Sequence, residues 1–126
     1  MKMTDETNRR EPRTPMRRAY VEYARSGTRL SRLFRLEVRR GPVVDLSKTG
    51  VQFRTTEMLE SGETIFVTLR LPQSSEAIRA KAVVRRSREE RKVGVENYTH
   101  VIGAEFVECT PRNWELIAAA LQEQSD

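Results

Sequence analysis

The fold is indicated most clearly by residues 43–55, Val43-Val44-Asp45-Leu46-Ser47-Lys48-Thr49-Gly50-Val51-Gln52-Phe53-Arg54-Thr55. Residues 51–55 alternate apolar and polar side chains, as a half-buried strand does. The segment 45–50 separates this strand from the apolar run before it, and it contains Asp, Ser and Gly, which favour turns. The stretch therefore predicts two strands joined by a turn that carries a carboxylate and a hydroxyl two residues apart.

Short runs rich in β-forming residues lie on both sides of this stretch. They predict strands at residues 19–24, 34–40, 64–71, 77–86 and 100–108. A short helical turn at residues 30–34 is an alternative for part of the second run. Residues 87–97 are highly charged and contain Gly94, which predicts a long exposed hairpin loop. Many short strands separated by turns are typical of a small antiparallel barrel.

A helix is predicted after the last strand. Thr110 suits the N-cap and Pro111 suits the first helical position. Helical spacing places Trp114, Ile117, Ala118 and Leu121 on one face. We expect this face to pack on the barrel or cover one end of it, with Trp114 as a core anchor.

The composition indicates one soluble domain. The chain has 126 residues, of which 37% are hydrophobic and 33% charged. No window approaches the roughly 18 apolar residues of a membrane span, and the first eight residues lack the apolar centre of a signal peptide. We expect a flexible lead-in at residues 1–8, one domain at residues 9–126, no membrane insertion and a cytoplasmic location.

The sequence offers little for metal or catalytic chemistry. It has one cysteine, Cys109, and one histidine, His100, so it cannot form an intrachain disulfide or a CxxC-type zinc site. Cys109 is expected to be a small apolar filler and His100 a side chain without a catalytic role. We find no nucleophile paired with a base and no phosphate-gripping Walker loop. We therefore expect no catalytic residues, no metal and no cofactor, and hence no enzyme.

Positive charge is concentrated near the amino end. Residues 1–41 hold 12 Lys and Arg against 5 Asp and Glu, whereas residues 42–126 hold 11 against 13. Nearly all of these N-terminal cations are arginines, and such asymmetry indicates an anionic partner. Arginine forks match phosphate and the acceptor face of guanine bidentately, and a carboxylate such as Asp45 can accept from the guanine NH groups.

The arginines cluster in Arg9-Arg10-Glu11-Pro12-Arg13, which reads RxxxR, and Asp45-Leu46-Ser47-Lys48-Thr49-Gly50 reads DxSxxG. Pro12 and Pro15 keep the cluster out of a helix interior, which predicts an extended arm or loop. The pair of motifs, in this order and with a strand between them, resembles the RxxxR and (D/N)xSxxG signatures of the PilZ domain family. The resemblance covers residues 9–121. The gap between Arg13 and Asp45 is longer than expected for compact members, and Arg13-Thr14-Pro15-Met16-Arg17 offers a second RxxxR.

The resemblance implies a mainly β fold, a six-stranded antiparallel barrel with a C-terminal α-helix. It also implies a bacterial receptor or adaptor for cyclic di-GMP. The residues expected to bind this ligand are Arg9, Arg10, Arg13, Asp45, Ser47 and Gly50. The arginines would contact phosphates and bases, Asp45 would accept from guanine or hold an arginine, and Ser47 would donate its hydroxyl. Gly50 would allow a positive φ or the close approach of a base.

In this interpretation the arm folds over the turn when ligand binds, and an unidentified protein partner reads the altered surface. The expected process is motility, surface behaviour or exopolysaccharide control. One alternative is a degenerate PilZ-like scaffold that binds only proteins. A second is a basic nucleic-acid-binding barrel, which the pI of 9.9 favours. The arm, however, lacks interleaved aromatic residues for stacking bases, so we do not expect a nucleic-acid partner.

Overall fold

Strands make up most of the structure, a computed structural model that describes residues 13–26, 38–72, 74–90 and 98–125. Its elements are β1 (Thr14–Pro15), β2 (Tyr20–Arg25), β3 (Arg39–Leu46), β4 (Gly50–Thr55), β5 (Thr64–Arg70), β6 (Ile78–Glu89), β7 (His100–Glu108) and α3 (Pro111–Ser125). The predicted lead-in at residues 1–8 lies outside the described residues.

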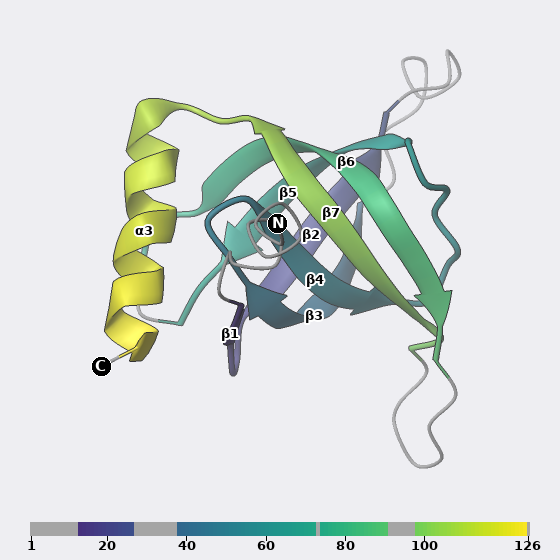
Figure 1. Cartoon of the computed structure of the whole chain (residues 1–126), viewed down its shortest axis with the longest axis horizontal. Helices are drawn as coiled ribbons and strands as arrows, with labels where there is room; N and C mark the ends of the chain where they lie inside the picture. The colour runs from purple at the N-terminus through teal and green to yellow at the C-terminus, as the bar shows by residue number, and fades with distance from the viewer. Residues whose placement is uncertain (1–12, 27–37, 73, 91–97, 126) are drawn as a thin grey trace, which may run out of the picture.

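The strands β2 to β7 close into an antiparallel barrel (Figure 1). The sheet order is β1-β3-β2-β5-β6-β7-β4, and a further pairing of β3 with β4 closes it. The short β1 adds to β3 outside the ring, with Thr14 opposite Leu46 and Pro15 opposite Asp45. The predicted six-stranded barrel with a C-terminal helix is confirmed. Closure removes the free strand edges that would otherwise pair with other chains.

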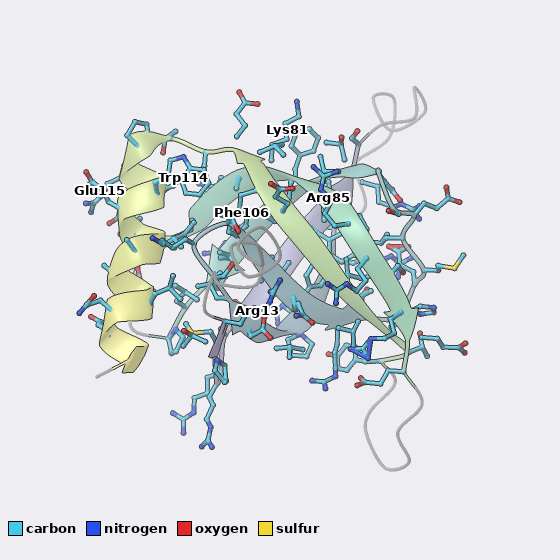
Figure 2. All side chains as sticks on the ribbon, viewed as in Figure 1. Arg13, Lys81, Arg85, Phe106, Trp114 and Glu115 are labelled. Carbon is cyan, nitrogen blue, oxygen red and sulfur yellow. The ribbon has the colours of Figure 1, made fainter. Side chains whose placement is uncertain are left out.

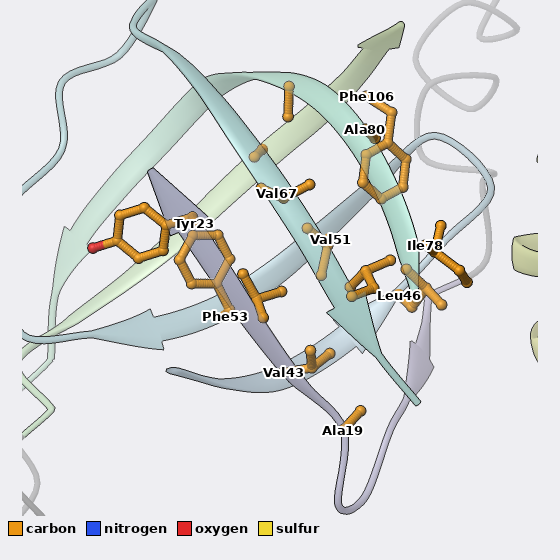
Figure 3. Packing of buried hydrophobic residues seen from close by; sticks show 14 of the residues in the cluster. Ala19, Tyr23, Val43, Leu46, Val51, Phe53, Val67, Ile78, Ala80 and Phe106 are labelled. Atoms are coloured by element: carbon orange, nitrogen blue, oxygen red, sulfur yellow. The ribbon is translucent and has the colours of Figure 1, made fainter. Parts of the chain in front are cut away.

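Alternation along each strand fills the barrel with apolar side chains (Figure 3). The strand β5 shows the pattern most clearly, since Ile65, Val67 and Leu69 are buried while Phe66 is exposed. Small side chains at Ala80, Ala82 and Ala104 are also buried. The strongest predicted strands therefore adopt the faces that their period of two indicates.

The helix α3 begins as predicted but turns a different face to the barrel. Thr110 caps it, because the Thr110 hydroxyl accepts from the Asn113 amide at 3.1 Å. Ile117 and Ala120 are buried, whereas Ala118 is exposed. Trp114 remains 37% exposed and packs against Phe106 in a T-shaped arrangement, with ring centroids 6.1 Å apart. The prediction that Trp114 anchors the core was therefore wrong, and the buried stripe is rotated by one residue from the predicted one.

Two strand boundaries also differ from prediction. β3 is continuous from Arg39 across Pro42, which lies opposite Tyr20, so no break separates it from the apolar run before the turn. Most of the strand predicted at residues 34–40, like the alternative helical turn, lies outside the described part of the chain. β6 continues to Glu89, where the predicted loop should already have begun, because Arg88 and Glu89 still find partners in β7. The charge of residues 87–97 therefore led to a wrong prediction of where β6 ends.

A polar network occupies one end of the barrel core, and we call it the Glu57 cluster: Tyr23, Arg25, Arg39, Thr55, Glu57 and Glu63. The buried Tyr23 hydroxyl lies 2.6 Å from Thr55 Oγ1 and donates to Glu57 Oε2 at 2.8 Å. Glu57 also pairs with Arg25 and Arg39. Burial raises the pKa of the Tyr23 hydroxyl well above its ordinary value. The hydroxyl therefore stays protonated and acts as a donor.

Candidate functional site

The predicted turn lies between β3 and β4, and Ser47 holds it together. The Ser47 amide donates to the Gly50 carbonyl at 2.9 Å. Its Oγ accepts from the amides of Thr49 at 3.3 Å and Gly50 at 3.2 Å. Only 1% of Ser47 is exposed. In this conformation the Ser47 hydroxyl bonds within the turn and stabilises it, and its donation to a ligand stays a prediction.

Gly50 is required by strand packing rather than by an unusual backbone angle. A Cβ at this position would lie 2.4 Å from the carbonyl oxygen of Ala104 on β7. Among the described residues, the positive φ angles belong to Arg18 and Gly62. The positive φ predicted for Gly50 was therefore wrong. The close approach seen here is that of the β7 backbone, and the close approach of a base stays a prediction.

Asp45 and Arg13 bring the two sequence motifs into contact. Arg13 immediately precedes β1, which pairs with the end of β3. Its Nη1 donates to Asp45 Oδ1 at 3.2 Å, with the Arg13 side chain 45% exposed and that of Asp45 17% exposed. The strand register shifts between Val43 and Asp45, and such bulges re-aim side chains near sites. The carboxylate thus holds one arginine of the arm above the turn.

Of the other candidate arginines, Arg17 lies among the described residues. Arg9 and Arg10 lie outside the described residues. Arg17 and the neighbouring Arg18 form an exposed turn between β1 and β2. Arg17 does not line the pocket that Arg13 reaches.

A pocket of about 180 Å³ lies on the outer surface of the barrel beside this ion pair. It is lined by Arg13, by Thr49, Gly50 and Gln52 of the turn and β4, by Arg85 and Arg86 of β6, and by Gly103, Ala104 and Glu105 of β7. Arg13 and Arg85 both lie on the barrel face over which β7 runs (Figure 2). Its volume is below the roughly 300–1,000 Å³ of a typical small-molecule site. It can hold one planar group or one phosphate of a larger ligand.

The electrostatics of the pocket favour an anion that also carries polar edges. Three arginines border it, and two carboxylates hold two of them: Asp45 holds Arg13, and Glu105 Oε1 accepts from Arg85 Nε at 2.8 Å. The third, Arg86, has no carboxylate partner in the described structure. The described residues contain no cluster of ligating side chains suited to a metal ion. Nor do they contain a helix that is apolar and long enough to span a bilayer.

Sequence reasoning did not identify the β6 and β7 side of the pocket. A signal was present, since a glycine inside an apolar strand, such as Gly103, often marks close approach of a ligand or backbone. The adjacent Arg85 and Arg86 gave no such signal, because alternation predicts that only one of two neighbours faces outward. A register shift between Val84 and Arg86 lets both face outward, and such a shift is not visible in the sequence.

Residues 7–123, nearly the whole chain, match the PilZ domain family. This chain belongs to the PilZ domain family. The match spans both motifs and the contact between Arg13 and Asp45, so the resemblance noted from the sequence is confirmed. No curated protein matches the chain.

Solved structures of PilZ type have the same fold. The PilZ domain of YcgR from Escherichia coli, solved with c-di-GMP, is 14% identical, with 93% of this chain and 91% of that one covered and a TM-score of 0.70. The Bacillus subtilis inhibitor of motility MotI/DgrA is 20% identical, with 85% and 47% covered and a TM-score of 0.64. MrkH, titled a c-di-GMP-dependent transcription regulatory factor, is 18% identical, with 91% and 50% covered and a TM-score of 0.68. The chain thus spans about half the length of MotI/DgrA and MrkH.

Proposed function

We propose that this PilZ protein is a receptor for cyclic di-GMP that passes the level of this second messenger to a protein partner. One observation carries the proposal: Arg13 and Asp45, one from each motif, are in contact beside a pocket that two further arginines border. The likeness in fold to the ligand-bound PilZ domain of YcgR supports it. The ligand-binding residues would be Arg9, Arg10 and Arg13 of the arm, with Asp45, Ser47 and Gly50 shaping the turn beneath them.

In the proposed mechanism Asp45 positions Arg13 before the ligand arrives. A guanidinium group has five N–H donors, and only Nη1 of Arg13 is seen to donate to Asp45. The remaining donors can reach a phosphate or a guanine edge. Fixing further arm residues costs about 1–2 kcal/mol each in backbone entropy. Hydrogen bonds from arginine to a charged group, at about 1.5–3 kcal/mol each, can offset that cost.

The biological output in this proposal depends on a partner. The ordered arm would change the surface beside the turn, and a protein that controls motility, surface behaviour or exopolysaccharide production would recognise the change. Such a role needs no catalysis and no cofactor. Because cyclic di-GMP is an intracellular second messenger, the proposal places the protein in the bacterial cytoplasm.

Isothermal titration calorimetry with cyclic di-GMP tests the proposal. Wild-type protein should bind, and Arg13→Ala should lose measurable binding at tens of micromolar ligand while keeping its circular dichroism spectrum. Arg17→Ala is the matched control, since Arg17 is equally basic but lies in the exposed turn. If Arg17→Ala abolishes binding as well, the second RxxxR, made of Arg13 and Arg17, is the operative pair.

The rival functions give different results in the same set of measurements. Wild-type protein that gives no heat with cyclic di-GMP would contradict the receptor proposal and favour the scaffold that binds only proteins. A gel shift with nucleic acid that weakens steeply with salt would favour the basic nucleic-acid-binding barrel.

A further inference from the structure

A row of three residues crosses the pocket floor on neighbouring strands. Gln52 on β4 lies opposite Gly103 on β7, and Gly103 lies opposite Arg86 on β6. Neighbouring strands are about 4.8 Å apart, so the backbones that carry Gln52 and Arg86 are about 10 Å apart. Between these two long polar side chains, Gly103 presents only backbone. The row therefore forms a flat slot with a hydrogen-bonding group at each side.

The packing of the barrel does not explain why this slot is open. A Cβ at Gly103 would lie 3.6 Å from Arg86 Cβ and 3.9 Å from Gln52 Cγ, which are ordinary contact distances. A Cβ at Gly50, in contrast, would clash with a backbone carbonyl. Glycine weakens a strand interior because it has no side chain to pack and loses more entropy on folding. The open floor at Gly103 therefore suits a ligand rather than the fold.

Arg86 differs from its neighbour in having no acidic partner. Arg85 donates to Glu105. No ion pair or hydrogen bond from the Arg86 guanidinium to another described residue is present, and the residue is exposed. Its full fork of donors is available beside the slot.

We propose that Arg86 makes the site selective for guanine, an inference that depends on the proposed function. A base lying flat over Gly103 would place one edge toward Arg86 and the other toward Gln52. Guanine presents two acceptors, O6 and N7, which an arginine fork satisfies together. Adenine presents N7 beside an amino donor, so the same fork would leave one of its donors unmatched. Arg86 is then a specificity-determining residue outside both sequence motifs.

Calorimetric titrations with cyclic di-GMP and cyclic di-AMP test this assignment. Wild-type protein should prefer cyclic di-GMP. Arg86→Ala should weaken binding of cyclic di-GMP by about tenfold or more and narrow the preference, since a bidentate contact to guanine discriminates by about this factor. Arg88→Ala is the matched control: Arg88 lies on the same strand and is exposed, but does not line the pocket. The Arg88→Ala change should alter the affinity for cyclic di-GMP and for cyclic di-AMP by less than about twofold.

A second variant tests the slot without removing a charge. Gly103→Ala adds one methyl group at contact distance, so the protein should keep its fold and lose affinity for cyclic di-GMP. An unchanged preference in Arg86→Ala, or an equal loss for both ligands, would overturn the assignment of Arg86 while leaving the receptor proposal intact. Wild-type protein that binds neither dinucleotide would overturn both.

Discussion

The Glu57 cluster and the pocket both contain arginines and carboxylates. The two regions differ in how many of these charged groups have partners within the protein. In the Glu57 cluster one carboxylate takes part in three contacts, with Tyr23, Arg25 and Arg39. In the pocket, Arg13 has one contact to a carboxylate and Arg86 has none among the described residues. The cluster adjoins the barrel core, whereas the pocket lies on the outer wall.

This difference separates the groups that support the fold from those available to a ligand. A polar group whose hydrogen bonds are already made inside the protein contributes to stability, and its removal leaves partners unsatisfied. A guanidinium with unused donors contributes little to stability but can bind an anion strongly. Mutations in the Glu57 cluster should therefore lower the stability of the protein, whereas mutations in the pocket should lower its affinity for the ligand.

The largest effect on stability is expected for Glu57→Ala. This change removes the acceptor of the buried Tyr23 hydroxyl and a partner of both Arg25 and Arg39. The free energy of unfolding should fall by about 2–3 kcal/mol, because hydrogen bonds to charged groups are the stronger kind. Urea denaturation measures this loss, and affinity for cyclic di-GMP should stay within about twofold of wild type.

A control from the pocket sharpens that result. Glu105→Ala removes a carboxylate whose partner, Arg85, is largely exposed, so it should cost less than about 1 kcal/mol. If Glu105→Ala destabilises the protein as much as Glu57→Ala, the distinction between the two regions is wrong.

Acid should weaken the Glu57 cluster through Glu63. Burial alone would raise the pKa of Glu63, but hydrogen bonds from Arg25 and from the Glu60 amide outweigh it and lower the pKa from its ordinary value of 4.5. Since the folded state favours the charged carboxylate, its contribution to stability is present above pH 4.5 and is lost as the pH falls through the lowered value.

Urea denaturation of wild type and Glu63→Gln at several pH values measures this contribution. Wild type should be more stable than Glu63→Gln at neutral pH, and this difference in stability should shrink as the pH falls below 4.5 and passes through the lowered pKa of Glu63. A difference in stability that stays constant as the pH falls well below 4.5 would show that the ion pair with Arg25 does not control this part of the acid response.

Local patterns were sufficient to predict the barrel and one side of the pocket. Alternation along β5 and β7 reflects the two faces of a sheet, so the buried side chains could be read from their spacing. The turn between β3 and β4 was visible because Asp45, Ser47 and Gly50 are close in sequence. Its contact with Arg13 was suggested by the resemblance to the family rather than by any local rule.

The opposite side of the pocket could not be predicted, because it depends on register between distant segments. Gln52, Gly103 and Arg86 form a row only after β4, β7 and β6 pair. The outward direction of both Arg85 and Arg86 needs a register shift. The prediction that Trp114 anchors the core was wrong for a related reason. Helical spacing identifies a face of the helix, but the way α3 packs on the barrel decides which residues of that face are buried.

The smallest effect on stability is expected for Asp45→Ala, although its effect on binding should be large. The ion pair with Arg13 is a single contact of 3.2 Å to a side chain that is 45% exposed, and pairs of this kind contribute about 0–1 kcal/mol. Loss of Asp45 frees Arg13 from its position above the turn, so the ligand must then fix that side chain as well as the rest of the arm. We expect affinity for cyclic di-GMP to fall by about tenfold, since ordering costs for such a side chain are near 1.4 kcal/mol. Denaturation and calorimetry on the same sample separate the two effects. If the variant binds normally but has lost several kcal/mol of stability, Asp45 supports the fold of the barrel rather than ligand binding. The position of Arg13 beside the turn would then need another explanation.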